Sequence, residues 1–512
     1  MSWNYQRSID RILEHLDSLG EIQIEKLVRE ADLRSLLSET CCREIFGAHV
    51  YVDVPNFNAL ATEVEGEDYR RVVQAVHLYQ REVSRIVEQS DLFDALRVHF
   101  QGPKLHALIY RPIDDSATIA GRALLLQIVI RDFVRRVFNP EFPSLPDIAV
   151  AGGADIGKAI GTQDGMRGDR ELLFLGRPAN YAAKIIGSAG QMRITAQIYD
   201  ALPESLQELC QELDDEIYAL NILAGDEVEE LAAEFNVAWD PEASRARIQQ
   251  DKRTFPLKDI RYSEADTLID LDSLGINNNK RVLGASLFAD VDKFTAYIDA
   301  ATTTEQKKTA LRVLHAIRKE MAAVVKHDFD GLRIQYQGDR VQALLHLPKD
   351  DGGKIIDKTV DVAAALQSSM ELCIKRLLPE AASLGLALGL DIDITLVSKL
   401  GIRGDRDRIC IGTAVQKAAE TQEACHSLEI GTTQRAYSLL SEDSAGQFTF
   451  DKERGIYVAT GLTVEKMERL AKAAAYRSGS PVYVSSSSAG VAVSSSKVAN
   501  QREVFPARSY SA

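Results

Sequence analysis

The chain contains two copies of one sequence pattern, and this repeat limits the folds open to it more than any other feature. GAHVYVDVPNFN at 47–58 matches GASLFADVDKFT at 284–295, an apolar run that ends in an aspartate. LRVHFQGPKLHAL at 96–108 matches LRIQYQGDRVQAL at 332–344, and both indicate a hairpin with a glycine turn. The separation between matching blocks is constant to within one residue. The repeat therefore predicts a duplicated domain.

A third pair of blocks completes the repeat. RGDRELLFLGRPANYAAK at 167–184 and RGDRDRICIGTAVQKAAE at 403–420 each predict a strand that turns into a helix. Within each copy the order is strand, helical region, hairpin, helix, strand and a final strand-to-helix turn. This order is typical of a ferredoxin-like βαββαβ core. We expect an α/β (α+β) protein with two such domains in tandem.

The repeat and the composition between its blocks divide the chain into five segments. Residues 1–46 are expected to form amphipathic helices that serve in packing. The first copy spans 47–225, a charged linker region with a helix spans 226–281, and the second copy spans 282–470. The serine-rich tail over 471–512 is expected to be disordered.

Composition excludes several classes of function. The net charge of −15 would repel phosphate backbones, so a broad nucleic-acid surface is not expected. No apolar run approaches the roughly 18 residues that a membrane helix needs. The six cysteines include no CxxC pair, which disfavours a zinc ribbon and a disulfide framework. We expect a cytoplasmic protein that has neither nucleic acid nor a membrane as a partner.

The two copies differ at a pair of acidic positions. The second copy has Asp290 at the end of its first strand and Asp339 directly after the hairpin glycine, whereas the first copy has Asp53 and then Pro103. Taken singly these are ordinary strand-end and turn acids. Two carboxylates at the ends of adjacent strands form a hard oxygen site for Mg²⁺ or Mn²⁺, the ions that bridge nucleotide phosphates. The pairing favours a metal site in the second copy.

In the last block the asymmetry is reversed. The first copy has Asn180 and Lys184, four residues apart on one helix face, where the second copy has Gln416 and Glu420. An amide can orient a ribose and a cation can stabilise charge that develops on a phosphate, whereas a glutamate would repel it. A solvated helix face is the alternative interpretation of the Asn180 and Lys184 pair.

These blocks together resemble the catalytic domain of class III nucleotidyl cyclases. The first block of that family reads like FADIxGFT, here FADVDKFT from Phe288; the second contains GD, here Gly338 and Asp339. The third has a glycine, an asparagine four residues on and an arginine four beyond, and the first copy supplies Gly176, Asn180 and Lys184. The lysine keeps the charge of the family's arginine but loses its planar fork.

The resemblance implies how the two copies share one active site. In that family two catalytic domains dock head to tail, and each site takes metal ligands from one domain and the remaining residues from the other. Asp290, Val291 and Asp339 would hold two Mn²⁺ or Mg²⁺ ions, Asn180 would orient the ribose, and Lys184 would stabilise the phosphate. The mirror site then appears degenerate, and its residues are Asp53, Pro103, Gln416 and Glu420.

The base-reading positions of that family carry neither purine code. They lie three residues before the hairpin glycine and three before the last-block glycine, and here they are His99 and Leu173. Adenylate cyclases typically have Lys and Asp there, and guanylate cyclases Glu and Cys. A pyrimidine is the open alternative. Arg97 is expected to share a strand face with His99, and its donors suit the carbonyl groups of uracil, which slightly favours UTP over CTP.

Tyr51 precedes Asp53 on the same face and would narrow the base pocket against a purine, although ordinary strand packing explains it equally well. Tyr51 and Arg97 together resemble the pyrimidine cyclases of bacterial Pycsar antiphage systems. That resemblance implies a uridylate or cytidylate cyclase whose 3′,5′-cyclic product activates a separate effector protein without a stable complex.

Three other functions remain open from the sequence. They are a purine cyclase with an atypical base pocket, a catalytically inactive nucleotide-binding regulatory module, and a scaffold that binds a protein. Independent decay would rarely leave the metal acids in one copy and Asn180 with Lys184 in the other, so an active composite site is expected. The linker permits the copies to dock within one chain or to exchange between the chains of a homodimer.

Overall fold

The computed structural model describes residues 2–63, 69–164, 171–221, 223 and 225–469. The serine-rich tail predicted over 471–512 lies outside these residues. None of the described helices is long and apolar enough to span a bilayer.

Two β-sheets account for the strands of the described chain. The strands of the first sheet are β1 (Gln23–Lys26), β2 (Cys41–Asp53), β3 (Leu96–Gln101), β4 (Lys104–Ile109), β5 (Ala151–Asp164), β6 (Glu171–Leu175), β7 (Met192–Thr195), β8 (Cys210–Asp214) and β9 (Ile217–Leu220). The strands of the second are β10 (Tyr262–Ser263), β11 (Asn279–Asp292), β12 (Leu332–Gln337), β13 (Arg340–Leu345), β14 (Gly385–Ile402), β15 (Asp405–Ile411), β16 (Glu429–Thr432), β17 (Thr449–Asp451) and β18 (Ile456–Thr460).

Helices connect these strands. In the first half they are α1 (Tyr5–Ser18), α2 (Leu33–Leu36), α3 (Asn58–Glu63), α4 (Arg70–Glu88), α5 (Ser116–Phe133), α6 (Asn139–Glu141), α7 (Arg177–Lys184), α8 (Ala196–Ala201), α9 (Glu204–Gln207), α10 (Asp226–Glu234) and α11 (Pro241–Thr254). In the second half they are α12 (Phe294–Asp299), α13 (Thr304–Ala323), α14 (Gly352–Ser369), α15 (Lys375–Leu377), α16 (Thr413–Glu423), α17 (Gln434–Tyr437) and α18 (Glu442–Ala445). Short π- and 3₁₀-helical turns are η1 (Val134–Phe138), η2 (Leu257–Asp259), η3 (Val324–Asp328), η4 (Met370–Ile374) and η5 (Pro379–Ala381).

The two sheets have the same strand order, which confirms the tandem duplication. The order is β3-β4-β2-β5-β7-β9-β8 in the first sheet and β12-β13-β11-β14-β16-β18-β17 in the second. In each copy the first four strands of that order pair antiparallel and are joined as a βαββαβ unit, so the predicted ferredoxin-like core is present twice. Even an irregularity is repeated, because both edge strands carry a bulge at the same position, between Arg97 and His99 and between Arg333 and Gln335.

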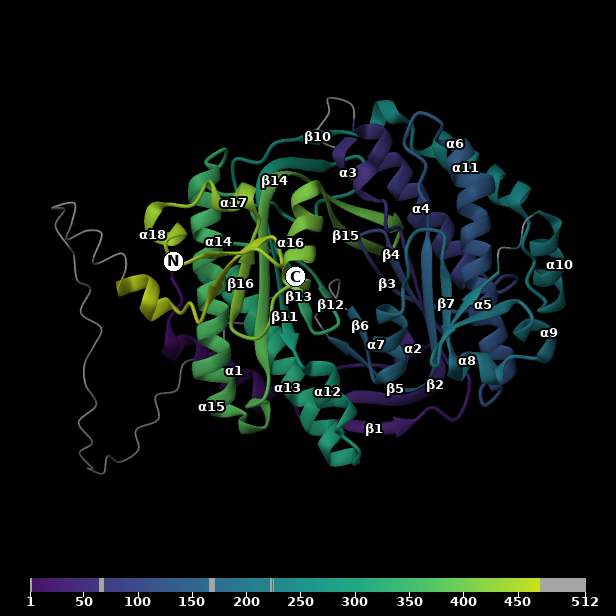
Figure 1. Cartoon of the computed structure of the whole chain (residues 1–512), viewed down its shortest axis with the longest axis horizontal. Coiled ribbons are helices and arrows are strands. Elements are labelled where there is room, and N and C mark those ends of the chain that lie inside the picture. Colours follow the sequence, from purple (N-terminus) through teal and green to yellow (C-terminus); the bar gives the residue numbers. More distant parts are fainter. Residues whose placement is uncertain (1, 64–68, 165–170, 222, 224, 470–512) are drawn as a thin grey trace, which may run out of the picture. The chain divides into compact units, whose positions relative to one another are not determined.

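Each copy extends a two-stranded arm into the core of the other. Leu400 and Ile409 of the β14–β15 arm are buried among the apolar side chains of α4, α5 and the first sheet. Ile160 and Leu173 of the β5–β6 arm are buried in the cluster formed by α13, α14 and the second sheet. Figure 1 shows the β14–β15 arm reaching toward α4. The copies are therefore docked within one chain, as one of the two predicted arrangements required.

The segments outside the repeat differ in part from expectation. Residues 1–46 form two helices but also strand β1, which pairs parallel with β2, and β2 already begins at Cys41. Helix α1 packs on α13 of the second copy, with Ile12 buried while Leu13 is exposed. Of the region predicted as a linker, α10 and α11 fold onto the first copy, where the Trp239 indole donates a hydrogen bond to Asp132 (2.9 Å).

Candidate active site

The predicted metal carboxylates lie together in the second copy. Asp290 is near the end of β11, and Asp339 follows Gly338 in the hairpin between β12 and the adjacent strand β13. Burial raises the pKa of Asp339 well above its usual value, and the neighbouring Asp290 raises it further. Burial also raises the pKa of Asp290. Two carboxyl groups that resist ionisation in each other's presence form a site that a cation would stabilise.

Helix α7 brings the residues of the first copy to this carboxylate pair. It begins after Gly176, whose φ of 140° and close approach to the Lys158 carbonyl favour glycine. Lys184, in the last turn, has a charge that partly opposes the burial that raises the pKa of Asp290 and of Asp299 on α12. Asn180 lies one turn earlier and is half-buried. The fold therefore brings Lys184 of the first copy within electrostatic reach of Asp290 of the second, where α7 lies against α12.

The donor set suits a hard divalent cation. Within the described residues no group of three or more His, Cys, Asp or Glu side chains could hold a metal ion. Asp290 and Asp339 supply carboxylate oxygens, whereas the buried Val291 side chain has no donor atom, so only its main-chain carbonyl could bind a metal. Carboxylate and carbonyl oxygens are the ligands that Mg²⁺ and Mn²⁺ prefer.

The predicted degenerate site is a cavity of about 270 Å³ between the two copies. All four of its predicted residues contribute to the lining: Asp53, Pro103, Gln416 and Glu420. Their charges are largely satisfied within the cavity wall. Lys104 lies 3.1 Å from the Asp53 carboxylate, and Glu420 accepts hydrogen bonds from Gln416 (3.1 Å) and Lys417 (2.7 Å). At the positions equivalent to Asp339 and Lys184 this wall has Pro103 and Glu420.

Two of the four predicted base-recognition residues, Tyr51 and His99, lie against the same histidine ring. Tyr51 on β2 stacks on His106 of β4 at 4.1 Å between ring centroids, and His99 of β3 lies 5.4 Å from the same ring. Leu173 is buried on the β5–β6 arm against the second copy's core. Burial, with a smaller contribution from the positive charge of Arg97, lowers the pKa of His99 to about 3. This histidine is therefore neutral.

Arg97 does not share the face of His99, which corrects the expectation from strand alternation. The bulge between them places Arg97 opposite Ala107 and His99 opposite His106, and these partners are adjacent residues of β4. Adjacent strand residues face opposite sides of a sheet. The extra residue of the bulge changes the alternation in a way that no pattern of side-chain types revealed.

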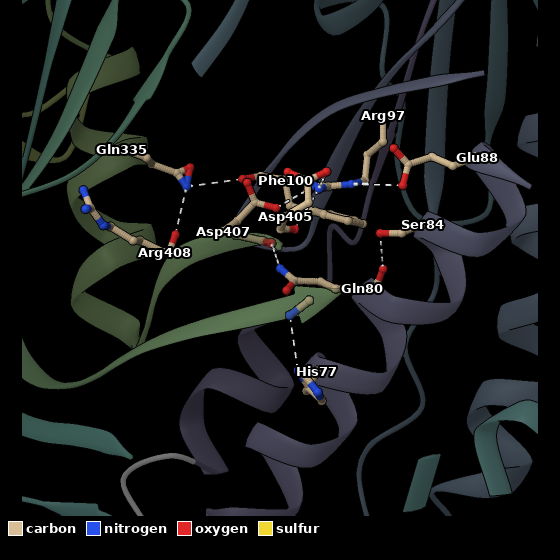
Figure 2. A network of polar contacts seen from close by, with 12 residues as sticks. His77, Gln80, Ser84, Glu88, Arg97, Phe100, Gln335, Asp405, Asp407 and Arg408 are labelled. Carbon is tan, nitrogen blue, oxygen red and sulfur yellow. Dashed lines mark hydrogen bonds and ion pairs between the residues drawn. The ribbon is translucent and has the colours of Figure 1, made fainter. Parts of the chain in front are cut away.

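The Arg97 guanidinium is bonded to the second copy. Figure 2 shows it directed at the β14–β15 arm, where it donates to the Asp407 carboxylate (2.7 Å) and the Asp405 main-chain oxygen (2.8 Å). The same figure shows Gln335 of β12 bridging the main-chain oxygens of Phe100 and Arg408 (both 3.3 Å). That Arg97 reads the base stays a prediction; in this structure its terminal nitrogens hold the copies together.

An equivalent ion pair lies at the mirror position. Arg333 occupies the position of Arg97 in the second copy, and its guanidinium lies 2.6 Å from the carboxylate of Glu171, which occupies the position of Asp407. Glu171 also accepts a hydrogen bond from the Tyr336 backbone (2.9 Å). Each copy therefore docks its edge strand on the other's arm by the same type of contact.

The sequence interpretation missed several residues of both sites. His49 and His106 adjoin Tyr51, Lys104 neutralises Asp53, and Arg340 adjoins Asp339, whose pKa its charge lowers. The repeat itself carried a usable signal, because His106 and Lys104 align with Gln342 and Arg340 of the second copy. Comparing the copies beyond the catalytic motifs would have singled them out.

Known proteins with this organisation are cyclases. The chain is 33% identical over 473 residues to a uridylate cyclase of Pseudomonas aeruginosa, covering 88% of both chains. It is 30% identical over 403 residues to a uridylate cyclase of Rhizobium sp., covering 74% of this chain and 75% of that one. A crystal structure of a class III adenylyl cyclase-like ATP-binding protein from P. aeruginosa is 29% identical, with a TM-score of 0.79 over 92% of this chain and all of that one.

No family model matches the chain. Both relatives match this chain over about three quarters or more of their own length. The superposition on the solved structure covers all of that structure, so it includes both copies of the repeat. The chain is therefore a nucleotidyl cyclase of class III fold and belongs to the uridylate cyclase family.

Proposed function

We propose that the chain converts UTP to 3′,5′-cyclic UMP and pyrophosphate at the single composite site. In this reaction the ribose 3′-oxygen bonds to the α-phosphorus, the bond from that phosphorus to the β-phosphate's bridging oxygen breaks, and the 3′-hydroxyl proton is released. The observation that carries the proposal is that Asp290, which adjoins Asp339 in one copy, lies within electrostatic reach of Lys184 of the other. The names of the two relatives support uracil as the base.

Each residue of the site has a task set by its chemistry. Asp290, Asp339 and the Val291 carbonyl would hold Mg²⁺ or Mn²⁺, which when bound acidifies the 3′-hydroxyl and neutralises the phosphates. Lys184 stabilises negative charge on the phosphate through its ammonium group. Asn180 orients the ribose through its amide, so that the 3′-oxygen faces the phosphorus.

The base would be bounded by Tyr51, His99 and Leu173, with Tyr51 limiting the room for a purine. The inter-copy bonds of Arg97 favour a role in docking for that residue. We further propose that the cyclic nucleotide activates a separate effector protein in antiphage defence, as the resemblance to Pycsar cyclases implies. Action in the cytoplasm belongs to the same proposal.

The test is product identification. Purified protein is incubated with UTP, CTP, ATP or GTP and Mn²⁺, in parallel with Asp290→Asn, and products are identified by mass. Cyclic UMP that disappears in the variant is the expected result. If the product is cyclic CMP instead, the substrate is CTP rather than UTP. ATP is included because the solved relative is described as ATP-binding; a cyclic purine would make the chain a purine cyclase, and binding without any product would indicate a regulatory module.

A further inference from the structure

The register of the two sheets identifies additional side chains that face the composite site. In the mirror cavity Phe288 and Gln342 are part of the lining, and they oppose each other across β11 and β13. In the first copy Tyr51 on β2 and His106 on β4 oppose each other in the same register. The equivalence of the two copies therefore places Tyr51 and His106 on the composite site as Phe288 and Gln342 are placed on the mirror cavity.

His106 has a hydrogen-bonding atom without a partner. Its ring is parallel to that of Tyr51, with an interplanar angle of 11°, and its Nε2 lies 2.9 Å from Nδ1 of His49. Its Nδ1 is buried and has no hydrogen-bond partner among the described residues. An unpaired buried polar atom is costly, so such an atom beside an active site indicates a ligand contact.

The two imidazoles are neutral, because burial lowers the pKa of His49 to about 3 and that of His106 well below its usual value. A neutral imidazole has one donor and one acceptor nitrogen. The bond between His106 Nε2 and His49 therefore decides whether His106 Nδ1 donates or accepts.

We propose that His106 is a specificity-determining residue that hydrogen-bonds the pyrimidine ring of the substrate through Nδ1, with His49 as a positioning residue that selects its tautomer. This inference rests on the proposed function. Uracil presents acceptor, donor and acceptor along its pairing edge, so one imidazole nitrogen can match either O4 or N3–H. Tyr51, stacked on the same ring, closes the space that a second purine ring would need.

The test compares two substitutions that each keep one half of the imidazole. His106→Gln keeps a polar atom near Nε2 and so the contact with His49, but it loses Nδ1. His106→Asn keeps a polar atom near Nδ1 and loses the contact with His49. Gln is also the second copy's residue at this position. The matched control is Gln342→His, which changes the mirror cavity alone.

We expect His106→Gln to raise KM for UTP roughly tenfold with little change in kcat, and to lower the preference for UTP over CTP by a similar factor. His106→Asn should retain more of that preference, and Gln342→His should behave as the wild type. If His106 had a merely structural role, His106→Asn would impair the enzyme more than His106→Gln, and the preference for UTP over CTP would stay unchanged. That result would overturn the inference. His49→Asn, with a smaller expected rise in KM, is the second variant if His106→Gln does not fold.

The failure of this inference is distinguishable from failure of the proposed function. A wild type that cyclises no pyrimidine nucleotide contradicts both. A wild type that makes cyclic UMP, with His106→Gln unchanged in KM and in nucleotide preference, contradicts the inference alone. Calorimetric binding of 3′-deoxy-UTP, which lacks the attacking hydroxyl, measures the base contact without turnover, and weaker binding by His106→Gln is expected.

Discussion

The composite site and the mirror cavity arise from the same fold but have opposite charge patterns. At the proposed composite site Asp290, beside Asp339, is within electrostatic reach of Lys184 of the other copy, and burial raises the pKa of both carboxyl groups. At the mirror cavity Pro103 replaces one carboxylate, and Lys104 pairs with the remaining Asp53. Duplication thus supplied two equal frameworks with different side chains, and we propose that only the composite site binds a triphosphate.

The strongest test of this asymmetry removes the carboxylates one copy at a time. Asp290→Asn and Asp339→Asn should each lower cyclase activity by roughly 10²-fold to 10³-fold or more, because each removes an anionic ligand of the metal site. Asp53→Asn should leave the rate unchanged. The measurement is cyclic nucleotide formation with Mn²⁺. Equal losses from Asp53→Asn and Asp290→Asn would show that both sites turn over.

The lysine at the end of α7 gives the next largest effect. Lys184→Ala should reduce kcat roughly 10²-fold, since it removes charge stabilisation of the phosphate, and Lys184→Arg should retain most of the rate. Glu420→Ala, at the equivalent position of α16, is the control and should have no effect. Steady-state kinetics with saturating UTP separate kcat from KM. A loss in KM alone would mean that Lys184 binds the substrate without stabilising the transition state.

Arg97 and Arg333 should contribute equally to the stability of the protein, although the two sites differ in chemistry. Arg97→Ala and Arg333→Ala each leave a partly buried carboxylate, Asp407 or Glu171, without its main partner, which we expect to cost about 3 kcal/mol of unfolding free energy. Urea denaturation measures this cost. If Arg97→Ala instead keeps its stability and raises KM for UTP, Arg97 reads the base.

The pH dependence of stability distinguishes the docking contacts more finely. The pKa of Asp407 is raised to about 6, because burial and the nearby Asp405 together outweigh the opposing charge of Arg97. An unfolded aspartate titrates near ~3.9, so the folded chain binds this proton more tightly, and the stabilisation is complete below pH ~4 and lost as the pH rises through about 6.

Between pH 4 and 7 we therefore expect the unfolding free energy of the wild type to fall by up to about 3 kcal/mol relative to that of Asp407→Asn. Urea unfolding of both proteins across that range measures the difference. A constant difference between the two proteins would mean that Arg97 keeps Asp407 ionised throughout.

Much of the fold was predictable because the same sequence pattern occurs in both copies. Strand, hairpin and helix motifs recur at equal separation, so an ambiguous assignment in one copy is supported by the other. The N-terminal segment was not predictable in full, because β1 owes its strand conformation to pairing with β2 rather than to its own alternation. Helices α10 and α11 were likewise assigned to a linker, because many of their residues are charged and only a few side chains, such as Trp239, anchor this region to the first copy.

The candidate site was predictable in its chemistry and less so in its geometry. Asp290, Asp339 and Lys184 were named from the reciprocal differences between copies, and the structure brings them together. The shared face of Arg97 and His99 was wrong, because one bulged residue changes which side chains point together. His106 was missed because the comparison of the copies stopped at the catalytic motifs, although His106 aligns with Gln342 of the second copy.

The sequence by itself determined the duplication, the ferredoxin-like units and which copy carries which reactive groups, because these depend on residue type and spacing along the chain. The tertiary structure decided how the copies meet: the exchange of the β5–β6 and β14–β15 arms, the use of Arg97 in docking and the stacking of Tyr51 on His106. Those contacts join residues hundreds of positions apart. Their geometry depends on packing and strand register, which local sequence patterns do not encode.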